Sequence, residues 1–170
     1  MTTTTATSGK RRTEADASVG FTASRHLAEA LQQVLVDLVE LHLQGKQAHW
    51  NVIGHNFRDL HLQLDEVVDE ARGQSDTIAE RMRALGAVPD ARTDVVAATT
   101  TLPAFPEGEL DVPKVVDLTA TRLHAAADTC RKVHDGVDSE DPTTADQLHQ
   151  IIENLEKLAW MVRAENRSTA

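Results

Sequence analysis

Residues 57–86, FRDLHLQLDEVVDEARGQSDTIAERMRALG, decide the predicted fold. Apolar and small residues recur there at steps of three and four, the spacing that places them on one face of an α-helix. These positions are Phe57, Leu60, Leu64, Val67, Ala71, Ser75, Ile78, Met82 and Leu85. Gly86 follows the last of them, and glycine commonly ends helices. The stretch therefore predicts one long amphipathic helix with a buried face.

The same spacing predicts three further helices around this one. The first starts at Phe21 and ends near His49, the third starts at Val112, and an acidic turn over 138–144 precedes the fourth. Their core positions are Leu27, Leu31, Val34, Leu38, Leu41, Gly45 and His49, then Val112, Val115, Thr119, Leu123, Ala126, Cys130, Val133 and Val137, and finally Leu148, Ile151, Ile152, Leu155, Leu158, Ala159 and Val162.

A long connection over residues 87–111 joins the second and third helices. It contains Pro89, Pro103, Pro106 and Gly108, and its segment 92–99 could form a short helix. Four amphipathic helices with one long connection predict an all-α four-helix bundle with a crossover, as in ferritin-like folds. Because many helical bundles share this pattern, it does not by itself identify a function.

The chain divides into a Thr- and Ser-rich tail over 1–20, expected to be disordered, a single bundle domain over 21–166, and a short C-terminal tail over 167–170. Its formal net charge of −10 disfavours nucleic-acid binding by the body of the protein. Cys130 is the only cysteine, which excludes an intrachain disulfide; we expect a small buried core residue rather than a nucleophile. No secretory signal or membrane-spanning run is visible, so a cytoplasmic protein is expected.

Five residues form the candidate site: His49, His61, Asp65, Asp76 and Glu80. The pairs 61/65 and 76/80 are each spaced i, i+4 and so project from one helix face. With His61 at zero, the other three lie at about 40°, 60° and 100° around the helix, to one side of its core stripe. Eleven residues separate Asp65 from Asp76, about 16 Å of helix, so the two pairs cannot hold one ion within a chain.

Antiparallel pairing of two copies of this helix would bring the pairs together. In such a pairing, residues whose numbers add to one constant value face each other. His61 would face Glu80 and Asp65 would face Asp76, because both pairs of numbers add to 141. Asp69 would likewise face Arg72, an opposite charge. A two-fold interface requires such self-complementarity, so the sequence predicts a metal site between subunits.

Simpler explanations exist for each residue alone. Exposed helix faces normally carry solvated carboxylates, and a lone histidine such as His49 is more often a hydrogen-bonded core residue than a ligand. The combination of two imidazoles with three carboxylates favours metal binding. Without thiolates, these ligands suit Fe(II) or Mn(II), with Zn(II) still open. The Glu-x-x-His motif of di-iron sites within one bundle is absent.

Residues 46–86 carry AHWN, F-x-x-L-H-x-x-L-D-E and D-x-I-A-E-R-x-x-x-L-G at fixed spacing. This stretch resembles the Dps family (DNA-binding proteins from starved cells), and the resemblance extends over roughly residues 21–166. It implies an iron-binding ferroxidase centre, mono- or di-iron, in which His49, His61 and Asp65 are matched by Asp76 and Glu80 of a second subunit. Trp50 matches an aromatic residue beside that centre, although simple packing would also explain it.

The resemblance further implies a hollow dodecamer that oxidises Fe(II), preferentially with hydrogen peroxide rather than O₂, and stores the ferric mineral. A pore through which iron enters would lie before the last helix. Asp146 is its best match, followed by Asp141 and Asp138, although Asp146 could simply favour the helix dipole. Leu158 and Pro142 depart from residues common in relatives.

A competing interpretation is a nucleoid-compacting DNA-binding protein whose metal site is vestigial. Its basic residues would be Lys10, Arg11 and Arg12 of the tail, next to Glu14 and Asp16. Five intact ligand positions favour the ferroxidase. A purely structural bundle would leave the face carrying residues 61, 65, 76 and 80 unexplained.

Overall fold

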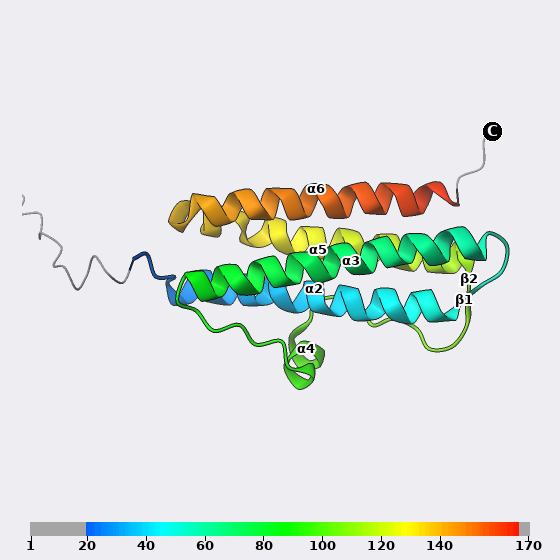
Figure 1. Cartoon of the computed structure of the whole chain (residues 1–170), viewed down its shortest axis with the longest axis horizontal. Helices are drawn as coiled ribbons and strands as arrows, with labels where there is room; N and C mark the ends of the chain where they lie inside the picture. Colours follow the sequence, from blue (N-terminus) through cyan, green and yellow to red (C-terminus); the bar gives the residue numbers. More distant parts are fainter. Residues whose placement is uncertain (1–19, 167–170) are drawn as a thin grey trace, which may run out of the picture.

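The computed structural model describes residues 20–166, and the predicted all-α fold is confirmed. Four long helices form a bundle (Figure 1). They are α2 (Arg25–Asn51), α3 (Phe57–Ala84), α5 (Val112–Glu140) and α6 (Pro142–Ala164). The connection between α3 and α5 contains the short helix α4 (Thr93–Thr99), close to the predicted segment 92–99.

The bundle consists of two antiparallel hairpins, α2–α3 and α5–α6, packed on each other. The crossover connects the two hairpins and runs back along the α2 side of the bundle, with α4 on its outer side (Figure 1). Two-residue strands β1 (Val52–Ile53) and β2 (Leu110–Asp111) pair in parallel, with Val52 opposite Leu110. This pairing, which the sequence analysis did not predict, fixes the end of α2, the start of α3 and the start of α5 at one end of the molecule.

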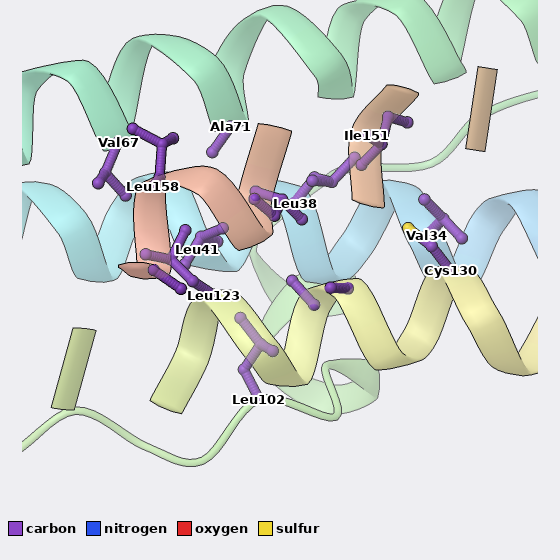
Figure 2. Packing of buried hydrophobic residues seen from close by; sticks show 14 of the residues in the cluster. Val34, Leu38, Leu41, Val67, Ala71, Leu102, Leu123, Cys130, Ile151 and Leu158 are labelled. Atoms are coloured by element: carbon purple, nitrogen blue, oxygen red, sulfur yellow. The ribbon is translucent and has the colours of Figure 1, made fainter. Parts of the chain in front are cut away.

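The predicted helix faces form the core. Side chains from all four long helices meet with Leu102 of the crossover (Figure 2). Cys130 is buried among them, as expected, and burial raises the pKa of its thiol to about 12, so the thiol stays protonated. Phe57 is an exception, because it lies at the start of α3, half exposed beside the turn.

Two predicted helix boundaries were wrong. Ser24 caps α2 by accepting a hydrogen bond from the Leu27 amide, so the helix starts at Arg25 rather than Phe21. The turn predicted over 138–144 is in fact only Asp141, because α5 continues to Glu140 and α6 starts at Pro142. Proline is well tolerated in the first turn of a helix, where its missing N–H costs nothing, and so Pro142 starts α6 instead of extending the loop.

A buried carboxylate fixes the crossover to the bundle. Asp37 of α2 is 1% exposed and accepts hydrogen bonds from the Thr101 amide at 2.7 Å, from the Thr101 hydroxyl at 2.6 Å and from the Thr129 hydroxyl of α5 at 2.8 Å. A buried carboxylate is stable only when such donors satisfy it. The network therefore joins α2, α5 and the crossover into one unit, which fixes the position of α2 and of the candidate site residue His49 on it.

Candidate metal centre

The turn between α2 and α3 brings His49 and His61 together. Gly54 and Asn56 adopt positive φ angles of 108° and 59°, which reverse the chain within a few residues. One turn before His49, a side chain on Gly45 would come within 2.8 Å of Val68, so glycine allows α2 and α3 to pack without this clash. The two imidazole rings stack with centroids 3.6 Å apart.

Hydrogen bonding fixes the tautomer of both rings. The His49 Nδ1 lies 3.0 Å from the carbonyl oxygen of His61, and the His61 Nδ1 lies 3.0 Å from the carbonyl oxygen of His49. A carbonyl oxygen only accepts, so each Nδ1 carries the proton and donates it. In the neutral ring, Nε2 then holds the free lone pair. This is the arrangement by which proteins orient a histidine as a metal ligand.

Asp65 completes this cluster, which we call the histidine half-site (His49, His61 and Asp65). Its Oδ1 lies 3.3 Å from the His49 Nδ1, and the same oxygen accepts a hydrogen bond from the Lys46 ammonium. That bond from Lys46 is the main reason the pKa of Asp65 lies below its usual value, with the nearby imidazoles adding to the effect against partial burial. The carboxylate is therefore ionised and held by a cation of the chain itself.

Sequence reasoning missed Lys46 as part of the site. It is the first residue of the stretch 46–86, three residues before His49, and that spacing on one helix face was the available signal. Whether its ammonium would reach Asp65 depended on the α2–α3 packing, which the sequence did not reveal. A metal ion that binds the Asp65 carboxylate would therefore compete with the Lys46 ammonium.

The acidic half-site, Asp76 and Glu80, lies farther along α3. Both side chains are exposed, outside the intrachain core, as the helical angles predicted. Asp76 borders an open hollow of about 600 Å³ whose lining includes Leu35, Val39, Arg72 and Ala79. The structure does not bring Asp76 and Glu80 to the histidine half-site of the same chain. Within residues 20–166, no three His, Cys, Asp or Glu side chains of a single chain form a group that could hold a metal ion.

Trp50 follows His49 and is 70% exposed at the end of α2. Ile53, Phe57 and Leu62 are also large exposed apolar side chains from the same end of the α2–α3 hairpin, and the Phe57 ring lies 5.2 Å from that of His61. Trp50 therefore does not pack within its own chain, so the simple packing alternative is not met inside one subunit.

The three predicted pore residues lie in different environments. Asp138 and Asp146 are exposed at the α5–α6 turn. Asp141 is only 8% exposed and accepts hydrogen bonds from the Arg81 guanidinium at 2.6 Å and from the Thr144 hydroxyl. Burial acts to raise the pKa of Asp141, but these hydrogen bonds outweigh it and lower the pKa. This inward pairing does not favour Asp141 as a pore-lining group. Lys10, Arg11 and Arg12 lie outside the described residues.

None of the helices in residues 20–166 combines the length and the apolarity needed to span a bilayer.

Curated proteins similar to this chain include two DNA protection proteins. DNA protection during starvation protein 2 of Deinococcus radiodurans is 34% identical over 83% of this chain, which spans only 58% of that relative's length. The DNA protection during starvation protein of Agrobacterium fabrum is 33% identical over 79% of this chain and 83% of its own length. The fine tangled pili major subunit of Haemophilus ducreyi is 40% identical over 84% of this chain and 76% of its own length.

Solved structures of Dps proteins are also similar to this chain. Dps92 from Deinococcus radiodurans superposes with a TM-score of 0.81 at 33% identity, covering 85% of this chain and 88% of that one. Dps from Microbacterium arborescens in the high iron form gives a TM-score of 0.76 at 35% identity, covering 86% and 98%. A profile of the ferritin-like domain matches residues 28–169, so the bundle is a ferritin-like domain. Within that class, the chain belongs to the Dps family of miniferritins.

Proposed function

We propose that this protein is a ferroxidase and iron-storage protein, which oxidises Fe(II) and sequesters the ferric product inside a hollow dodecamer. One observation carries the proposal. Two imidazoles, the buried His49 of α2 and the partly exposed His61 of α3, are fixed in the tautomer that presents Nε2, beside the ionised Asp65 carboxylate of α3. A nitrogen–carboxylate set without thiolate suits Fe(II). The names of the relatives support a role in protecting DNA under starvation.

The centre is proposed to lie between two subunits. In the antiparallel pairing of two α3 helices, the histidine half-site of one chain meets the acidic half-site of the other. Asp76 borders the hollow beside Arg72 and Ala79, the residues that would face Asp69 and Leu62 of a second copy. A half-exposed Leu62 and an opposite-charge pair at these places suit such an interface.

The proposed chemistry consumes peroxide without releasing radicals. Two Fe(II) ions give up one electron each, and one hydrogen peroxide takes up both electrons and two protons to become two water molecules. The role of the residues is to bind Fe(II): the Nε2 atoms of His49 and His61 and the carboxylates of Asp65, Asp76 and Glu80 would be its ligands. Protection of DNA and of the cell from oxidative stress would follow, because the reaction removes both Fe(II) and hydrogen peroxide.

The test is Fe(II) oxidation by iron-free protein, with hydrogen peroxide and separately with O₂, followed by counting the iron retained per assembly. The double variant His61→Ala/Asp65→Ala should oxidise Fe(II) at least 10-fold more slowly, since loss of even an outer-shell partner costs about 10–100-fold. His55→Ala, an exposed histidine in the turn between the two site histidines, is the matched control. Wild-type rates in the double variant, with assembly intact, would refute the assignment.

A further inference from the structure

A second histidine pair lies away from the proposed iron centre, in the groove between α5 and α6. The rings of His134 on α5 and His149 on α6 have centroids 4.4 Å apart and planes inclined by 31°. A pocket of about 300 Å³ opens beside them, lined by both histidines with Arg131, Asp135 and Ile152. Fifteen residues separate the two histidines in sequence, so only the α5–α6 hairpin brings them together.

Each ring of the pair has a carboxylate on its Nδ1 side. The His134 Nδ1 lies 3.2 Å from an oxygen of Asp135, which can only accept, so this nitrogen carries the proton. The His149 Nδ1 lies 3.9 Å from an oxygen of Asp146 on the preceding helical turn. A carboxylate behind the imidazole of a metal ligand orients the ring and increases its basicity. In His134, Nε2 is thus the atom left to bind a ligand; in His149 the 3.9 Å separation is too long for a hydrogen bond, and either ring nitrogen can bind.

The surroundings of the Nε2 atom of His134 also favour a bound ion. Its Nε2 is buried and lacks a hydrogen-bond partner in the described part of the chain. A buried polar atom without a partner is costly, and a bound ion would satisfy it. His149 is largely exposed, so an ion could approach from its side of the groove.

The surrounding charge favours a cation. Arg131 borders the pocket, but its guanidinium pairs with Glu156 at 2.5 Å and with Asp128 at 3.9 Å. The carboxylates of Asp135 and Asp146 remain beside the two rings. A divalent ion would therefore meet a net negative environment, with one arginine already neutralised.

We propose that His134 and His149 form a binding site for a borderline divalent transition-metal ion of the Zn(II), Cu(II) or Ni(II) class within one subunit. Imidazole nitrogen suits these ions, whereas carboxylate-rich sets suit Mn(II) and Fe(II). Nitrogens bound to one tetrahedral ion at 2.0–2.1 Å lie about 3.3 Å apart, so the two rings, whose centroids are 4.4 Å apart, would rotate to bring one nitrogen of each to the same ion. Water or a rotated Asp135 or Asp146 carboxylate would fill the remaining positions. The proposal does not depend on iron oxidation.

The experiment removes the proposed iron centre first. Protein without an affinity tag that carries His61→Ala/Asp65→Ala is titrated with Zn(II) by calorimetry and with Cu(II) by electron paramagnetic resonance. One ion per chain should bind, and the Cu(II) spectrum should show coupling to two nitrogens. His149 is exposed, so replacing it should not disturb folding. Adding His149→Ala should lower the affinity for the metal ion at least 10-fold and leave one coupled nitrogen.

His124→Ala on the same helix α5, outside the pair, is the matched control and should change neither affinity nor spectrum. Adding His134→Ala to His149→Ala should abolish the remaining nitrogen coupling. Unchanged binding in the His149→Ala protein, or a spectrum with no nitrogen coupling before this substitution, would overturn the proposal. Because the histidine half-site is already removed, failure here leaves the proposed ferroxidase untouched, and failure of the ferroxidase leaves this site untouched.

Discussion

His49 and His61 each donate their Nδ1 proton to the backbone carbonyl oxygen of the other, over 3.0 Å in both directions. The orientation of each imidazole ring thus depends on the backbone position of the other histidine. This reciprocity links the α2–α3 turn to the direction in which both Nε2 atoms point. The directions of the two Nε2 atoms are therefore set when the hairpin folds, which would reduce the ordering that binding a metal ion requires.

Replacing Lys46 with methionine should strengthen metal binding at the histidine half-site. The ammonium and the Asp65 carboxylate are both about one-third exposed or more, so their pairing is worth up to about 1 kcal/mol. Removing this competitor should tighten Co(II) binding by about two- to five-fold near neutral pH. Titration calorimetry of Lys46→Met against Lys132→Met, an exposed lysine on α5, measures the difference.

The same substitution should change the pH dependence of binding. Lys46 holds the pKa of Asp65 below its usual value, so in the wild type the carboxylate stays ionised to lower pH. In Lys46→Met that pKa rises, and protons begin to compete with the metal ion at higher pH. Weaker binding in Lys46→Met at neutral pH would instead show that Lys46 positions Asp65 for the metal.

Mixed assemblies should reveal whether the centre is shared. His61→Ala/Asp65→Ala destroys one half-site of a chain and Asp76→Ala/Glu80→Ala destroys the other, so each variant alone should be inactive. A hybrid interface regains one complete centre, because the surviving half-sites come from different chains. Random equal mixing should restore about a quarter of the wild-type Fe(II) oxidation rate. Hybrids shown by mass spectrometry to form, yet without activity, would exclude a shared centre.

Asp141→Asn should destabilise the fold by about 2 kcal/mol at neutral pH, since hydrogen bonds to a charged group are worth about 1.5–3 kcal/mol. Asp141 joins the α5–α6 turn to Arg81 of α3, while Asp138→Asn, at an exposed position, is the control. The measurement is thermal unfolding at one protein concentration, because the stability of an oligomer depends on concentration.

The effect of Asp141 should also depend on pH. Its folded pKa is lowered, so its contribution is complete above its usual pKa of 3.8 and is lost as the pH falls through the lower folded value. The difference between wild type and Asp141→Asn should therefore shrink only in strongly acidic solution. An equal difference at pH 7 and at pH 2 would mean that the carboxylate charge is not what stabilises the turn.

Any DNA binding should reside in the first twelve residues, which contain Lys10, Arg11 and Arg12 and no acidic residue. Binding should be indifferent to DNA sequence, since basic tails contact phosphates, and should weaken with salt at a log–log slope near −0.9 per phosphate neutralised. Several tails on one assembly would act together. Gel retardation across a salt series compares the full chain with a chain starting at Ala15; equal retardation would show that the tail is not responsible.

The sequence predicted the helices and their buried faces because a 3.6-residue repeat is a local property of the chain. Ile78 and Leu155 are buried where the spacing placed them, and Asp76 and Glu80 are exposed where the helical angles placed them. Helix ends were predicted less well. Apolar residues continue past a helix boundary, so the pattern predicts a start at Phe21; the acidic residues and Pro142 predict a turn over 138–144, although only Asp141 lies between the helices.

Contacts between distant residues were decided only by the tertiary structure. Lys46 and Asp65 are nineteen residues apart, and Arg81 and Asp141 are sixty apart, yet each pair shares a hydrogen bond. The sequence by itself determined which side chains lie outside the core, because the 3.6-residue repeat within one helix sets the face on which each residue lies. The tautomer of His49 and His61, the inward turn of Asp141 and the pairing of His134 with His149 depend on how one helix lies against another, which the turns, the crossover and close packing fix only in the folded chain.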